Sequence, residues 1–228
     1  MTQDPLREEA IESRWEAAPA VALVVVFQLV LALFSYQHDW KLWEFPWWVW
    51  LLPVGAEVVL LLPLAWGRPR RRLEQIGRRR TIALALLVVV SLANALTLGA
   101  LMISILTGHE DSGPELLLKG AAIWSTNVIS FGLWFWGIDR GGPVRRVEAN
   151  PPLPDFQFPQ DEDPQLAPHD WYPELIDYVY VSFTNSTAFS PTDVMPLTRR
   201  AKFLMLLESA ASAVTVLLVA ARAVNILD

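Results

Sequence analysis

The sequence contains no cysteine and only three histidines among its 228 residues. Disulfide bonds and thiolate metal sites are therefore excluded. The histidines are far apart, and none has a second histidine or a carboxylate at the spacing that a metal-binding helix uses. The sequence also lacks a nucleophile elbow, an HExxH pair and a glycine-rich phosphate loop. We therefore expect no enzymatic activity, no cofactor and no bound metal.

Charged residues are scarce as well. They make up 18% of the chain, against about a quarter in soluble domains. Hydrophobic residues reach 53% and lie in long blocks, and 11 tryptophans fit the interfacial belts of a bilayer. The basic residues cluster directly beside the apolar blocks, where the positive-inside rule accounts for them. We expect an integral membrane protein whose main partner is the lipid bilayer and which does not bind nucleic acid.

The apolar blocks predict an all-α membrane protein with about five transmembrane helices. A polar segment, residues 1–19, precedes a four-helix region, residues 20–138. Residues 139–172 form a basic turn and an acidic strap, and residues 173–228 a half-helix, a loop and the last span. The spans are expected at Ala20–Tyr36, Pro46–Trp66, Thr81–Leu106, Leu116–Ile138 and Ala201–Leu227.

The strap is distinguished by its composition. Residues 148–170 hold six prolines and six acidic residues, with no lysine or arginine. Such a composition predicts an extended, polyproline-like segment that lies on the surface and buries no core. The glycines Gly141 and Gly142 before it are typical of a helix end.

Three basic segments set the expected orientation: Arg68–Arg80, Asp139–Arg146 and Arg199–Lys202. With five spans, all three lie on the cytoplasmic side if the N-terminus is cytoplasmic. We therefore expect a multi-pass membrane protein with a cytoplasmic N-terminus.

Polar and small residues inside the spans predict helix contacts. Ser91, Ala95 and Gly99 recur every four residues, a spacing that lets two helices approach closely in lipid. Asn94 and Asn127 are expected to form interhelical hydrogen bonds. Small residues in the last span favour packing between subunits.

The stretch WYPELIDYVYVSFTNSTAFSPTDVMP, residues 171–196, predicts a helix from Pro173 to about Thr187. It combines an apolar stripe with a run of hydroxyl and amide side chains. The helix is too short and polar to span a bilayer alone, and such a segment is tolerated at membrane depth only inside protein or beside water. We expect a re-entrant or interfacial half-helix.

This stretch resembles the pore-helix and filter segment of the potassium-channel superfamily. The resemblance rests on Tyr180, Ser182, Phe183, Thr187, Asp193, Pro196 and Thr198, over roughly the last quarter of the chain. It implies that the following span is an inner helix, that copies form a homo-oligomer, and that the ligand is a monovalent cation. The filter glycines are replaced by residues 188–192, so a potassium-type carbonyl ladder is not expected. The charge-derived orientation also places this loop on the cytoplasmic side, opposite to a potassium-channel filter.

The whole chain also resembles an uncharacterised bacterial family of polytopic membrane proteins. Its apparent motifs here are WSTNVISFGLWFWGIDRGGP, PDFQFPQ, SFTNSTAFSPTDVMPLT and ARAVNIL. This second resemblance implies a location in the bacterial inner membrane and no known activity.

The candidate pore or ion-contacting residues fall in two groups. The loop supplies Thr184, Asn185, Ser186, Thr187, Ser190, Thr192 and Asp193. Alternatively, residues 190–193 read as a helix start, with serine as cap, proline next and a carboxylate reaching back. The spans supply Glu57 and Glu208, since a carboxylate inside a bilayer normally faces the bundle interior or water. Glu208 either sets cation preference or pairs with Lys202 or Arg200 near its helix start.

Two functions remain open at this point. The first is a channel-like oligomer that conducts cations or small solutes. The second is a non-conducting membrane scaffold or partner-binding protein, in which the polar half-helix only plugs the bundle.

Overall fold

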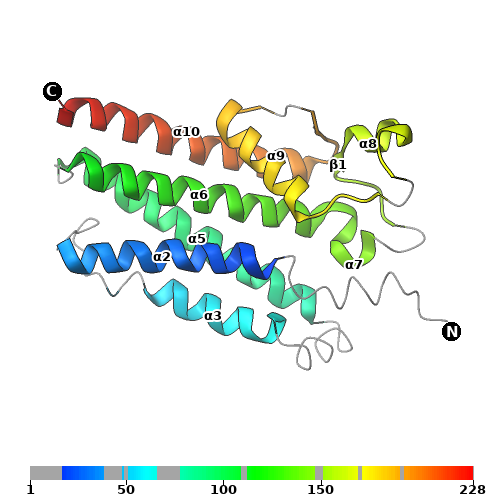
Figure 1. Cartoon of the computed structure of the whole chain (residues 1–228), viewed down its shortest axis with the longest axis horizontal. Helices are drawn as coiled ribbons and strands as arrows, with labels where there is room; N and C mark the ends of the chain where they lie inside the picture. The colour runs from blue at the N-terminus through cyan, green and yellow to red at the C-terminus, as the bar shows by residue number, and fades with distance from the viewer. Residues whose placement is uncertain are drawn as a thin grey trace.

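The computed structural model describes residues 17–38, 48, 51–65, 78–108, 112–146, 151–168, 171–190 and 193–227. These residues form a bundle of antiparallel helices (Figure 1). Its apolar members are α2 (Ala18–His38), α3 (Leu51–Ala65), α5 (Arg79–Leu106), α6 (Gly113–Ile138) and α10 (Arg199–Leu227). The expected all-α class is confirmed, and the apolar helices fit a membrane protein.

Four of these helices, α2, α5, α6 and α10, are long and apolar enough to cross a bilayer. The described part of α3 has 15 residues, which is about 22 Å of helix against a hydrocarbon core of about 30 Å. In the part of the chain that the structure describes, the second expected span is thus a shorter apolar helix. The ends expected for it, Pro46 and Trp66, lie outside the described residues.

Helix α6 is the centre of the bundle. Its apolar stretch is 72% buried, compared with 22% in α2 and α10. Helices α2 and α5 pack on one side of it, and α3 packs on those two. Helix α10 lies on the other side, together with the short helix α9 (Leu175–Ala188). The outer faces carry exposed leucines and valines, as lipid contact requires.

Local signals fix both ends of α6. At its start, the Ser112 side chain accepts a hydrogen bond from the backbone N–H of Glu115, and Pro114 occupies the first turn. At its end, a 3-10 turn over Asp139–Gly141 leads to Gly142, whose φ of 98° favours glycine. The expected helix end at the glycine pair is confirmed.

Most of the described arginines gather at one end of the bundle, whereas Lys119 and Arg222 lie toward the other. Helix α5 begins at Arg79, α6 ends next to Arg140, and α10 begins at Arg199 at this same end (Figure 1). A guanidinium nitrogen of Arg200 lies 3.5 Å from the carbonyl oxygen of Ile138 and connects the last two. Residues 68–77, the first part of the Arg-rich loop, lie outside the described residues.

The acidic strap differs from expectation. It contains β1 (Phe156–Gln157), α8 (Pro159–Glu162) and the 3-10 turn η3 (Pro164–Leu166). Strand β1 pairs antiparallel with β2 (Met195–Pro196), with Phe156 opposite Pro196. Phe156 and Phe158 are buried in one core with Phe135 and Tyr178. The prediction that the strap buries no core is wrong because Phe156 and Phe158 anchor it in this core.

The small-residue stripe on α5 forms fewer contacts than expected. Ser91 accepts a hydrogen bond from the indole N–H of Trp134 at 2.8 Å, but nothing lies within 4 Å of a Cβ placed on Gly99. The close approaches occur on α6 instead. A Cβ on Gly120 would lie 2.7 Å from the side chain of Val219, and one on Gly132 would lie 2.9 Å from that of Val179.

Candidate functional site

Helix α9 enters the bundle from the basic end and stops halfway. Near its start, the Tyr178 hydroxyl donates to the Asp139 carboxylate at 2.5 Å, level with the end of α6. Near its other end, the ring of Phe183 lies 5.6 Å from that of Trp124, midway along α6. The chain then returns to the basic end, where β2 pairs with β1 and α10 begins (Figure 1).

The bounds of α9 follow from its capping residues. Glu174 is the N-cap, and its backbone N–H donates to the carboxylate of Asp177 at 2.7 Å. The helix ends at Phe189, whose φ of 55° lies in the left-handed region. The expected helix from Pro173 to about Thr187 is therefore confirmed to within two residues at each end.

No helix starts in the described part of residues 190–193. Ser190 and Asp193 lie in bends, β2 follows, and the next helix begins at Arg199. The interpretation of this segment as a capped helix start is therefore wrong. The left-handed backbone of Phe189 ends the helix and turns the chain outward. The chain is then extended where β2 pairs with β1 of the strap.

Glu208 of α10 is fully buried and bonded to α9. The hydroxyl of Ser186 donates to Glu208 Oε1 at 3.1 Å, and the amide of Asn185 donates to Oε2 at 2.6 Å. The hydroxyl of Ser182 also contacts Oε1. All three partners lie one turn or less apart on one face of α9 and are themselves buried. The carboxyl group thus ties the half-helix to the last span.

The same network extends to α6. The Asn127 amide donates to the Ser212 hydroxyl at 3.0 Å and to the backbone carbonyl of Glu208 at 3.3 Å. The predicted interhelical role of Asn127 is confirmed. On α10, the Ser209 hydroxyl donates to the side-chain oxygen of Asn185 at 3.1 Å. Buried polar groups are stable in such a network only when each one has partners, as here.

The number of hydroxyl protons available indicates the protonation state of the Glu208 carboxyl group. Ser182 has one hydroxyl proton but two close oxygen neighbours, Glu208 Oε1 and the carbonyl of Val128 at 2.6 Å. A carbonyl cannot donate, so the serine proton serves Val128. The contact between Ser182 and Glu208 is then a hydrogen bond if Glu208 is a neutral carboxylic acid that donates to Ser182.

Of the two alternatives for Glu208, pairing with Lys202 or Arg200 is wrong. Arg200 binds Asp155 instead, with a guanidinium nitrogen 2.5 Å from the carboxylate, while Lys202 is exposed. Glu208 faces α9 and α6, whose serines and asparagines supply its hydrogen bonds.

The candidate residues of the loop divide by exposure. Asn185 and Ser186 are buried against Glu208, whereas Thr187, Ser190 and Asp193 are exposed. The hydroxyls of Thr184 and Thr187 donate to carbonyls of their own helix, at 3.0 and 2.8 Å. Thr192 lies outside the described residues.

A second polar cluster, which the sequence did not indicate, fixes the entry of α9. Asp139 is fully buried and accepts from the backbone N–H of Asp155 at 2.7 Å as well as from Tyr178. Burial raises the pKa of Tyr178, which keeps the phenol neutral and able to donate. Arg146 stacks on the Tyr178 ring and donates to the carbonyl of Pro173 at 3.0 Å. The segment was read as a basic turn, so its buried acid was missed.

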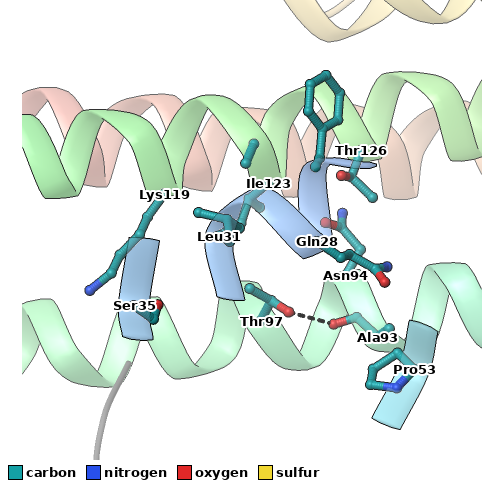
Figure 2. Close-up of a pocket in the computed structure, with 12 residues that line it drawn as sticks. Gln28, Leu31, Ser35, Pro53, Ala93, Asn94, Thr97, Lys119, Ile123 and Thr126 are labelled. Carbon is teal, nitrogen blue, oxygen red and sulfur yellow. Dashed lines mark hydrogen bonds between the residues drawn. The ribbon is translucent and has the colours of Figure 1, made fainter. Parts of the chain in front are cut away.

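The remaining acidic candidate, Glu57 of α3, lies in the other half of the bundle. It is fully buried, and its Oε1 accepts from the amide of Gln28 on α2 at 2.9 Å. Beside Gln28 is a cavity of about 40 Å³, lined by α2, α3, α5 and α6 (Figure 2). Among the described residues, no three His, Asp or Glu side chains gather as a metal site would require.

Comparisons of the chain with protein-family models, with curated proteins and with solved structures give no match. The site is therefore interpreted from its own geometry.

Proposed function

We propose that this chain is an integral membrane protein whose copies assemble into a channel-like oligomer for monovalent cations or small solutes. The observation that carries the proposal is the path of α9, which dips halfway along α6 and returns to its end of entry. Thr187 in the last turn of α9 and Ser190 just after the helix are exposed. Hydroxyl groups and irregular backbone at that depth need protein or water around them rather than lipid.

One subunit supplies one such half-helix and cannot enclose a pore. Several copies around a common axis would place their α9 ends together and cover the exposed polar residues. The exposed small residues of α10, among them Ala210 and Ala220, suit such packing. In this proposal Thr187, Ser190 and Asp193 line the path, and Glu208 positions the half-helix from behind.

A non-conducting scaffold is the second candidate, and the Glu208 network favours it. The carboxyl expected to set ion preference is enclosed by serines and asparagines and does not reach the surface. In that case the half-helix closes the bundle, and the exposed loop contacts a partner protein.

The proposed topology counts α3 as a fifth span and places the N-terminus in the cytoplasm of a bacterium, in the inner membrane. It is supported by the arginines at one end of the bundle, such as Arg79, Arg145 and Arg199.

The test is potassium and sodium flux into liposomes that hold the purified full chain. We expect flux in the wild type and a reduction in Asp193→Ala, while the matched exposed acid Glu162→Gln leaves flux unchanged. Tight vesicles with correctly inserted protein would favour the scaffold. A strictly monomeric protein in the membrane would contradict the channel.

A further inference from the structure

The cavity beside Gln28 is a further polar site, separate from α9. Six of the side chains around it are polar or charged: Gln28, Ser35, Asn94, Thr97, Lys119 and Thr126. The helices that carry them are among the most apolar in the chain, so this gathering of polar groups needs an explanation.

Two buried oxygen atoms have no hydrogen-bond partner among the described residues, one on a side chain that lines the cavity and one on the side chain bonded to it. They are Oε1 of Gln28 and Oε2 of Glu57, and the Gln28 amide nitrogen joins the two side chains. A buried acceptor without a partner is costly, and an ion or water in contact with it removes that cost. The Gln28 oxygen, on a side chain that lines the cavity, therefore indicates a ligand that supplies positive charge or hydrogen, and Glu57 lies directly behind it.

The surrounding groups favour oxygen ligation. Thr97 donates its hydroxyl proton to the carbonyl of Ala93 at 2.8 Å, so its oxygen can act only as an acceptor toward the cavity (Figure 2). Figure 2 shows the amides of Gln28 and Asn94 and the hydroxyl of Thr126 toward one end of the cavity. Amide, hydroxyl and carboxylate oxygens are the ligands that hard cations prefer.

The distribution of charged residues around the cavity also favours a cation. Lys119, at the other end in Figure 2, is 2.5 Å from Glu115 and thus has an acidic partner. In α2, α3, α5 and α6 the other charged residues lie in the first two turns of α5 and α6. Glu57 is the remaining charged residue of these four described helices. No described cation forms an ion pair with it. Arg222 belongs to α10, which does not line this cavity.

Size and ligand count restrict the ion. A volume of 40 Å³ holds about three water-sized groups, because one water needs about 10–15 Å³ in this measure. One carboxylate with neutral oxygens balances a single positive charge. From these observations we infer that the cavity between α2, α3, α5 and α6 binds one monovalent cation, of the sodium or potassium class, with one or two waters. Gln28 and Thr97 supply oxygen ligands, and Glu57 supplies the compensating charge from beside Gln28.

The experiment is equilibrium binding of ²²Na⁺ and ⁸⁶Rb⁺ to the purified full chain in detergent, with choline holding the ionic strength constant. Choline is too large for the cavity. We expect saturable binding of at least one of the two ions. Glu57→Gln should weaken it at least tenfold, and Thr97→Val, which removes one oxygen at nearly constant shape, should weaken it measurably. The matched control is Glu162→Gln, an exposed acid remote from the cavity, which should bind as the wild type does.

Absence of saturable binding by either ion would overturn the inference and leave a cavity that holds water beside a protonated Glu57. Binding that survives both Glu57→Gln and Thr97→Val but disappears in Asp193→Ala would also overturn it, since the ion would then belong to the α9 loop. The outcome is independent of the proposed channel. Tight liposomes together with Glu57-dependent binding would refute conduction alone, and flux without such binding would refute the cavity site alone.

Discussion

Removing the Glu208 side chain should detach α9 from the last span. Glu208→Ala deletes three side-chain contacts, with Ser182, Asn185 and Ser186. Hydrogen bonds between membrane helices contribute about 0.6 kcal/mol on average and up to about 1.7, so the loss of unfolding free energy should be about 2–5 kcal/mol. Asn185 keeps its hydrogen bond to the carbonyl of Met205 at 3.0 Å, so part of the network remains in the variant and the loss is not complete.

Glu208→Gln is the matched control. A glutamine has the same shape, can donate to Ser182 as the neutral acid does, and still accepts from Asn185. It should therefore lose less than half as much as the alanine variant. The assay is SDS-induced unfolding of the purified full chain in mixed micelles, followed by tryptophan fluorescence. Equal stability of the alanine variant and the wild type would refute the anchoring role of Glu208. A glutamine variant as unstable as the alanine one would refute the neutral form.

Two further predictions concern the setting of α9. Gly132→Ala should lower the unfolding free energy by about 1–3 kcal/mol in the same assay, because the new Cβ would lie 3.0 Å from the backbone Cα of Val179. The control is Gly99→Ala, which should be neutral because nothing lies within 4 Å of its new Cβ. Equal effects of the two substitutions would contradict this packing. Asp155→Asn should loosen the strap by about 1–3 kcal/mol, because it breaks the ion pair with Arg200. The readout is faster chymotryptic cleavage at the strap phenylalanines, and an unchanged cleavage rate would argue against the anchor.

The features that the sequence predicts best are those that extend over many consecutive residues. Apolar blocks of 17 to 27 residues predict the long helices because lipid leaves the backbone no other way to satisfy its hydrogen bonds. Helix α9 was predicted because its composition conflicts with its position: it is too polar and short for a span, yet stands just before one. The second expected span includes flanking tryptophans, whereas the described part of α3, Leu51–Ala65, holds none.

The buried polar contacts could not be predicted from the sequence. The sequence places Glu208 near Lys202 along α10, but its partners come from α9, more than twenty residues earlier. Likewise, the strap was read from its prolines and acids, while two phenylalanines decide its position. Gln28 was not singled out at all, although an amide in the middle of an apolar span is a signal that could have found it.

The most direct test of the account is whether α9 leaves the membrane on the side from which it enters. The chain has no cysteine, so single cysteines can be introduced at exposed positions before α9 (Leu153), after it (Leu197) and at the far end of α5 (Leu106). Labelling with a membrane-impermeant maleimide from each side of sealed vesicles gives the side of each position. We predict that Leu153→Cys and Leu197→Cys react from one side and Leu106→Cys from the other. Reaction of Leu153→Cys and Leu197→Cys from opposite sides would show that α9 crosses the membrane and would contradict the re-entrant half-helix.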